Sequence, residues 1–290
     1  MGLRLKFNLV LVFVFLLALG VTGYISHDLL HRNAQAEVLR NAGVMLEAAL
    51  SIRAYTVGEV RGKLRVVDNE FLPQGVPAFA ATEIMNQLRR KYPDYAYKEA
   101  ALNPTNPRNR TVEWESDIVN EFRNNDGRSE LSGTRMTPSG PSLYLARPLQ
   151  IKDAACLACH TTPDTAPVAM VKHYGTSNGF GWKLNEIIGA QIVSVPMALP
   201  IANANRAFYT FMTSLTAVFV VIFLVLNVML SVLIVRPITR MSVAADKISM
   251  GEMDVPEFGE GGSDEVSLLA KSFNRMRRSL EKALSLIDEK

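Results

Sequence analysis

The stretch "GAQIVSVPM", residues 189–197, predicts a β-strand that ends at a proline. Soon after it, "PIANANRAF" (200–208) leads into a long uncharged stretch, and no linker is evident between the two. The sequence therefore predicts a folded domain whose last strand passes almost directly into an apolar helix.

Other segments upstream predict the rest of this domain. Turns rich in Asn, Pro and Gly, such as "NPTNPRNR" and "TPSGP", separate three further strand-like segments. These strands are expected at 95–102, 129–136 and 141–151, with helices at 27–64, 81–94 and 111–124. "FLPQGVPAF" is expected to break the first helix, and Pro93 to end the second. The expected fold class is α+β, with one antiparallel sheet and a long N-terminal helix.

Two stretches without Asp, Glu, Lys or Arg, residues 7–27 and 207–235, are long enough to cross a membrane as helices. The first could instead be a cleaved signal peptide. However, "TGYISHDLLH" is a poor cleavage site, so an uncleaved anchor is favoured. Arg4 and Lys6 precede the first span, and Arg236 and Arg240 follow the second, which predicts that both ends are cytoplasmic. Residues 28–206 would then lie in the periplasm of a two-pass bacterial inner-membrane protein.

The overall composition agrees with a membrane protein. Hydrophobic residues make up 48% of the chain, and the formal net charge is only +3. The basic residues are scattered along the sequence, so no nucleic-acid surface is expected.

The C-terminal part, residues 236–290, has two helical blocks with apolar residues at alternating spacings of three and four. The first block contains Ile238, Met241, Ala245 and Ile248, and the second runs from Val266 to Ile287. A glycine-rich connector, "GEMDVPEFGEGGSDE", joins them. Through Pro237, Gly251, the "DE" at 264–265 and "FNRM" at 273–276, this region resembles a HAMP domain; a generic coiled coil is the alternative. The resemblance implies a homodimer, and a separate cytoplasmic signalling protein as the output partner.

The only two cysteines of the chain, Cys156 and Cys159, stand three positions apart in "CLACH" and are followed by His160. Chance placement would give this pattern about once in ten thousand trials. A zinc site would lack further cysteine ligands, and a thioredoxin-like redox pair would leave the histidine without a use. Covalent attachment of one haem c uses all three residues, with two thioethers and His160 as the proximal iron ligand.

The external region resembles the family of PAS-like, single-haem, c-type sensor domains, first described structurally in a cyanobacterium. The matching segments are "AALSIRAYT", "YPDYAYKEAALNPTNPRN", "PSLYLARP", "CLACH" and "GTSNGFGWKLNEIIGAQIVSVPM". The resemblance implies a cysteine of the N-terminal helix as the distal iron ligand, but this chain has no third cysteine.

The distal ligand is therefore left open. Met45 is the first candidate, His173 the second, and an open or water-bound position the third. Ordinary core packing for Met45 and a surface position for His173 are the alternatives. Arg53 and Tyr55, two turns beyond Met45, are candidates for haem contacts.

These features favour a sensor of redox state or of NO, CO or O2, which would signal through the spans and the HAMP region. The alternative is a membrane-anchored c-type cytochrome that exchanges electrons with a redox partner. No enzymatic activity is expected, because nothing in the sequence resembles a catalytic haem pocket.

Overall fold

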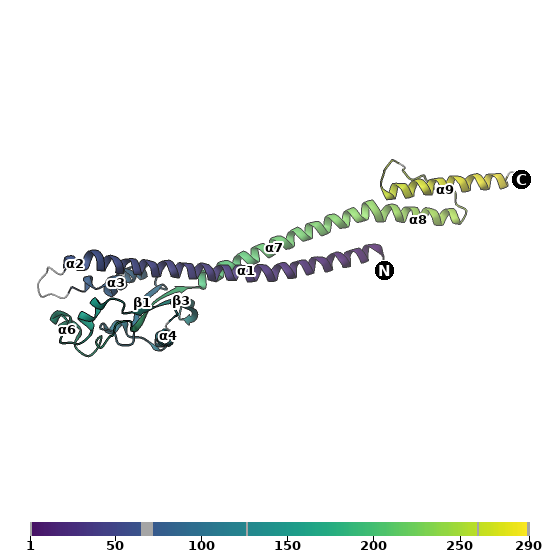
Figure 1. Ribbon diagram of the computed structural model, residues 1–290. Coiled ribbons are helices and arrows are strands. Elements are labelled where there is room, and N and C mark those ends of the chain that lie inside the picture. The colour runs from purple at the N-terminus through teal and green to yellow at the C-terminus, as the bar shows by residue number, and fades with distance from the viewer. Residues whose placement is uncertain (1, 65–71, 126, 260, 289–290) are drawn as a thin grey trace. The chain divides into compact units, whose positions relative to one another are not determined.

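The computed structural model describes residues 2–64, 72–125, 127–259 and 261–288 (Figure 1). The chain divides into two compact units. One unit comprises residues 27–207, and we call it the sheet domain. The other comprises residues 1–26 and 208–290.

The chain begins with a helix that is unusually long for a globular protein. Helix α1 spans Leu3–Tyr55 and continues through a π-helical turn, Thr56–Val60, into the short helix α2, Arg61–Leu64. The sequence predicted a helix over this stretch, but not the change to π-helical hydrogen bonding at Thr56. Of the predicted break, Phe71 lies outside the described residues, whereas Pro73–Gly75 form a 3-10 turn.

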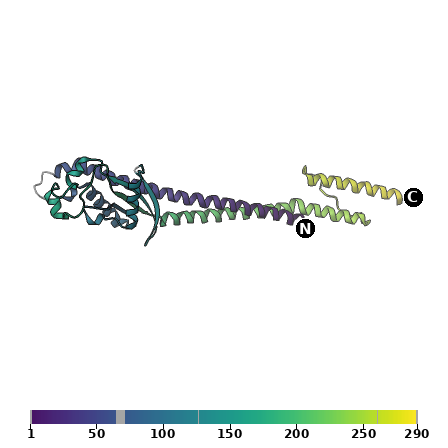
Figure 2. The ribbon, with the colours of Figure 1, turned by 60° about the horizontal axis from the view of Figure 1, so that its bottom comes forward.

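The sheet, which Figures 1 and 2 show from two directions, has four antiparallel strands. The strand order is β1-β4-β3-β2. The strands span Ala96–Ala101 (β1), Leu131–Thr137 (β2), Gly140–Gln150 (β3) and Ile187–Pro196 (β4). Four helices accompany them: Pro77–Lys91 (α3), Glu113–Asn124 (α4), Leu157–His160 (α5) and Val168–Tyr174 (α6). The prediction of an α+β fold on one antiparallel sheet is confirmed.

The two faces of the sheet pack against different helices. On one face, odd-numbered residues of β1, β3 and β4, including Tyr97 and Val193, form a core with Leu46 of α1 and Met85 of α3. On the other face, even-numbered residues such as Ala100 and Ile192 pack against α4. Alternate strand residues point to opposite faces, so each strand contributes to both cores.

In the other unit, two helices are long and apolar enough to cross a membrane. They are α1 and α7 (Ala198–Met229), which continues through a π-helical turn, Leu230–Val235, into α8, Arg236–Ser249. The rings of Phe15 and Phe219 stack with centroids 4.8 Å apart. The two helices therefore lie side by side in this unit, in antiparallel directions.

Helix α9, Glu265–Asp288, follows the connector. Asn274 on α9 is buried, and its amide bonds both backbone groups of Phe258 in the connector, at 2.7 and 3.1 Å. On α8 the buried alanine is Ala244, and Ala245 of the predicted apolar series is half-buried. The side chain of Ile287, predicted to end the second series, lies outside the described residues.

Candidate functional site

The cysteine pair lies on a short helical segment that follows β3. The side chain of Asp153 accepts a hydrogen bond from the backbone nitrogen of Ala155 at 2.8 Å, which starts the 3-10 turn Ala154–Cys156. Helix α5 continues this turn and carries Cys159 and His160. Cys156 and Cys159 are half-buried free thiols, and residues three apart on a helix are neighbours on its surface.

The imidazole of His160 has one well-defined hydrogen-bond partner. Its Nδ1 lies 2.8 Å from the backbone carbonyl oxygen of Gly179 and 3.4 Å from Oγ1 of Thr105. Because a carbonyl oxygen can only accept, Nδ1 donates its proton to Gly179, and Nε2 is left with a free lone pair. The indole of Trp182 stacks on the ring with centroids 3.9 Å apart, which fixes the ring plane. The Nε2 lone pair of His160 is therefore held in a fixed orientation, as a metal-ligating histidine requires.

The protonation state of His160 also suits a ligand. Burial lowers its pKa, the nearby positive charge of Arg61 lowers it further, and the bond to Gly179 only partly opposes this. The imidazole is therefore held neutral at neutral pH, and the neutral form is the one that binds metals.

Gly179 lies in a loop at a position that accommodates only glycine. Its φ is +83°, and an added Cβ would lie 2.1 Å from Oγ1 of Thr105. The side chain of Asn103 accepts a hydrogen bond from the Gly179 nitrogen at 3.1 Å and donates one to the carbonyl of Phe180 at 3.1 Å. The segment 103–105 thus holds the glycine loop against His160.

Two basic residues near the end of the N-terminal helical stretch act on Cys156. Burial raises the pKa of the Cys156 thiol, as does Asp153, whereas Arg61 and Arg53 lower it with a smaller total effect. The net pKa is raised, which leaves a protonated thiol at neutral pH rather than the thiolate that a redox-active CxxC pair requires.

Arg53 is anchored in a buried polar network. Its guanidinium pairs with Glu99 on β1, whose side chain is 2% exposed. The hydroxyl of Tyr97 donates to the same carboxylate at 2.8 Å, and Gln191 on β4 donates to that hydroxyl at 3.4 Å. Burial alone would lower the pKa of Arg53, but the attraction of Glu99 outweighs it and the pKa is raised. Arg53 therefore stays charged, and its charge acts on Cys156.

The π-helical turn explains why Arg61 acts at the same place. Eight residues at about 100° each would put Arg61 about 80° around the helix from Arg53. The π-helical turn contains one residue more than an α-helical turn, so Arg61 lies one residue step, about 100°, less far around the helix. The angle between Arg53 and Arg61 is then only about 20°, in the opposite sense. Both arginines therefore lie on nearly the same helix face, and both act electrostatically on Cys156.

The remaining predicted site residues have different surroundings. Met45 is 8% exposed and belongs to the core between α1 and the sheet. Along α1 it lies about 12 Å from Arg53, at 1.5 Å per residue. Tyr55 is 63% exposed, and His173 is an exposed residue of α6 with its ring against Tyr174. The role of each of these residues stays a prediction.

Several residues that act on His160, Cys156 or Arg53 were missed from the sequence. They are Arg61, Glu99, Thr105, Gly179 and Trp182. Gly179 and Trp182 stand in "NGFGW", where clustered glycines next to an aromatic residue could have signalled a tight loop.

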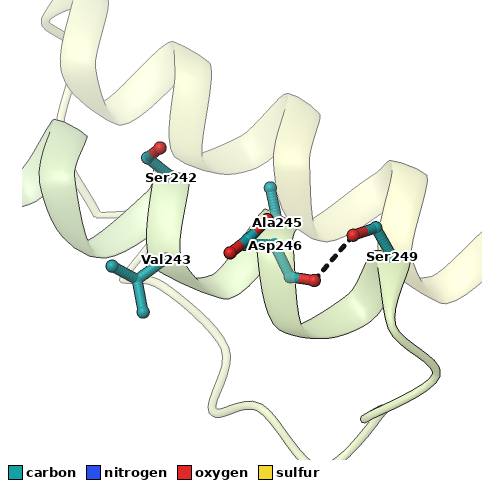
Figure 3. Close-up of a pocket in the computed structure, with 5 residues that line it drawn as sticks. All are labelled: Ser242, Val243, Ala245, Asp246 and Ser249. Carbon is teal, nitrogen blue, oxygen red and sulfur yellow. Dashed lines mark hydrogen bonds between the residues drawn. The ribbon is translucent and has the colours of Figure 1, made fainter.

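A hollow of about 530 Å³ lies elsewhere, on α8, and Figure 3 shows five residues that line it. All come from this one helix, and the bond from Ser249 Oγ to the Asp246 carbonyl at 2.6 Å stays within it. Among the described residues that line it, none comes from a second element, so we do not treat it as a candidate site.

Comparison with known proteins gives two family matches. A family described as Tll0287-like matches residues 31–196, and the HAMP domain matches residues 229–282. Among solved structures, the crystal structure of the cyanobacterial haem protein Tll0287 is similar at 17% sequence identity and a TM-score of 0.43. The similarity covers 55% of this chain and 95% of that one. The comparison with curated proteins gives no match.

Proposed function

The chain belongs to the Tll0287-like family, and from this we propose that its sheet domain carries one covalent haem c and acts as the input of a membrane-bound signal transducer. The observation that supports this best is the hydrogen bond from His160 to Gly179, which leaves Nε2 free as an iron ligand. Haem would supply an iron that changes oxidation state or binds a diatomic gas.

The residues around His160 fit such a group. Two adjacent, half-buried thiols can form thioethers with the vinyl groups of a porphyrin, directly before a neutral histidine of fixed tautomer. Arg53 and Arg61 lie on one helix face near Cys156 and can pair with carboxylates such as the propionates. Trp182 limits the rotation of the histidine ring.

Each end of the sheet domain is joined to an apolar helix by a short, ordered connection. Strand β4 ends at Pro196 and α7 begins at Ala198, and the nitrogen of Met197 between them donates to the Pro141 carbonyl at 2.9 Å. Arg53 lies on α1, which begins at Leu3, and Arg61 lies on α2, which continues α1 through the π-helical turn. A change around the cysteine pair can therefore act on both spans through continuous secondary structure.

The HAMP region would pass this change to a cytoplasmic signalling partner as a parallel homodimer. Apolar residues of α8 and α9, including Ile238, Leu269, Met276 and Leu280, are 40–54% exposed in the single chain. HAMP helices bury such residues against a second copy, and exposed apolar rows at heptad spacing favour this arrangement here. Arg4, Lys6, Arg236 and Arg240 favour a cytoplasmic location for this region and a periplasmic location for the sheet domain.

The first experiment tests haem attachment. The full-length chain, produced in a bacterium with a c-type maturation system, is denatured and its haem content is measured on the polypeptide. Haem should stay bound to the chain and be lost in the Cys156→Ala/Cys159→Ala double variant. Release of all haem from the unmodified chain by denaturation would contradict covalent attachment.

A second experiment distinguishes a sensor from an electron carrier. A Met276→Cys variant in α9 is cross-linked with a bismaleimide in the ferric, ferrous and CO-treated states. State-dependent cross-linking that disappears with an added His160→Ala change would support signalling. Identical cross-linking in all three states, together with rapid electron exchange, would instead support electron transfer.

A further inference from the structure

A second cavity, of about 340 Å³, lies on the face of the sheet that packs against α4. Its walls come from α3, α4 and strands β1, β2 and β4, so several elements converge on it. We call it the arginine pocket; Arg89, Lys98, Arg108, Trp114, Glu115 and Arg135 are among its lining residues. Neither the cysteines nor His160 line it, so it is separate from the proposed haem site.

Four basic side chains and one acidic side chain line this pocket. The acidic one, Glu115, is already engaged: its Oε2 lies 2.6 Å from Nζ of Lys98 and accepts the Val112 nitrogen at 2.9 Å. Arg108 pairs with Glu83. The charge on the pocket lining that Glu115 does not neutralise is therefore positive. It comes from the arginines rather than from Lys98.

Two of the arginines that line the pocket have no carboxylate within ion-pair distance in the described part of the chain. They are Arg89, whose Nε donates to the Pro93 carbonyl at 3.3 Å, and Arg135. The guanidinium of Arg135 lies over the ring of Trp114, 4.2 Å from its centroid. This contact holds the planar group in place and leaves its edge N–H groups available.

The pocket also has features that a solvated basic surface lacks. The indole of Trp114 and the side chain of Ile192 provide apolar walls, while Asn86, Asn109 and Ser194 add neutral polar groups. A volume of about 340 Å³ is at the lower end of the range for small-molecule sites, about 300–1,000 Å³. A haem is too large for it, whereas a molecule of several carbon atoms fits.

We propose that the arginine pocket binds a small organic carboxylate. The guanidiniums of Arg89 and Arg135 pair with its carboxylate oxygens, and Trp114 and Ile192 cover its carbon skeleton. Because β4 lines the pocket and leads directly to α7, the bound acid provides an input in addition to the haem. This goes beyond the proposed haem function and does not depend on it.

The test measures ligand-induced thermal stabilisation of the full-length chain in detergent, with and without haem. The probes are succinate and benzoate, with succinamide as the uncharged counterpart and inorganic phosphate as a second anion. At least one carboxylate should raise the unfolding temperature in a saturable way, whereas succinamide should not. Stabilisation equal to that by phosphate would overturn the assignment to an organic carboxylate.

Variants then place the binding site. Arg135→Gln and Arg89→Gln should each weaken carboxylate binding at least tenfold in calorimetric titration. Arg90→Gln, at the next residue of α3 and outside the pocket lining, is the matched control and should bind as the unmodified chain does. If Arg135→Gln prevents folding, Arg89→Gln still tests the pocket, because Arg89 is exposed and its replacement should not disturb the fold. Equal affinity in Arg89→Gln and the unmodified chain, or equal loss in Arg90→Gln, would overturn the proposal.

Discussion

The carbonyl oxygen of Gly179 lies 2.8 Å from Nδ1 of His160, although His160 ends helix α5 and Gly179 stands 19 residues later in a loop. This bond fixes the tautomer of the histidine, and a glycine with positive φ provides it. The orientation of the proposed iron ligand therefore depends on a residue that contributes no side chain.

Gly179→Ala should destabilise the sheet domain and disturb the histidine ligand. The added methyl group would meet Thr105 at 2.1 Å in a backbone conformation with φ of +83°. We expect a loss of about 3 kcal/mol or more in the free energy of unfolding, from steric overlap added to backbone strain. Gly175→Ala is the matched control, because its φ is +80° but nothing lies within 4 Å of an added Cβ.

The control should lose less, about 1–3 kcal/mol, which is the cost of a backbone conformation (φ +80°, ψ −173°) that essentially only glycine adopts. Denaturant unfolding followed by circular dichroism measures both variants, and the Soret spectrum reports the ligand. Equal losses in the two variants would show that the contact with Thr105 is unimportant.

Glu99→Gln should destabilise the sheet domain by about 3–5 kcal/mol, because it leaves the largely buried Arg53 without a counter-charge. The comparison is Asp28→Asn, which breaks the exposed pair of Asp28 with Arg32 and should cost about 0.5 kcal/mol or less. Urea unfolding measures both. A loss below about 1 kcal/mol in Glu99→Gln would mean that water reaches this pair.

The buried phenol of Tyr97 predicts sensitivity to alkaline pH. Burial, followed by the negative charge of Glu99, raises its pKa well above the ordinary value of about 10. Below that value both states hold the proton; above it, only the unfolded chain releases the proton, so stability falls as the pH rises. The free energy of unfolding should therefore decline from about pH 10 upward, and Tyr97→Phe should reduce the decline.

Tyr92→Phe, at an exposed tyrosine near the end of α3, is the control for this pH dependence. It should leave the alkaline decline unchanged. If Tyr97→Phe and Tyr92→Phe gave the same pH profile, Tyr97 would not be the group responsible.

The distal ligand is tested by Met45→Leu, which keeps the volume of a core side chain but removes the sulfur. If Met45 binds the iron, the resonance Raman marker bands should change from six-coordinate to five-coordinate or water-bound, with less than about 1.5 kcal/mol lost in stability. His173→Gln is tested in the same way. If Met45→Leu leaves the bands unchanged and His173→Gln changes them, His173 is the distal ligand. If neither variant changes the bands, the distal position is open or water-bound.

Asn274→Ala should release the connector of the HAMP region. The side-chain amide of Asn274 is 1% exposed and bonds both backbone groups of Phe258. Without it, two partly buried backbone groups lose their partner, at about 1 kcal/mol each. Limited proteolysis should cut the connector faster in Asn274→Ala, whereas Ser279→Ala, at an exposed position of α9, should match the unmodified chain.

The parts predicted from sequence were those with a periodic or local signal. Short strand-like segments between turns rich in Asn, Pro and Gly predicted the strands, and the spacing of Cys156, Cys159 and His160 predicted a haem site. The partners of His160 could not be assigned, because Thr105 and Gly179 are brought together only by the tertiary fold. Glu99 reads as a solvent-facing strand residue until Arg53 is placed opposite it.

The π-helical turns were also missed, since a wider helical turn has no characteristic composition. Residues 56–60 and 230–235 both read as ordinary helix in the sequence. At the first turn, this error matters for function, because it decides which way Arg61 points.

The second π-helical turn, Leu230–Val235, lies where the apolar helix α7 meets α8. It stores one residue more than an α-helix of the same length. If the π-helical turn changes to ordinary α-helix, α8 rotates by about 100° about its own axis. The backbone hydrogen bonds of the turn then change partners and are not lost. A change in this turn can therefore rotate α8 relative to α7. Deleting one residue between Leu230 and Val235 would remove the π-helical turn and leave α8 in one orientation.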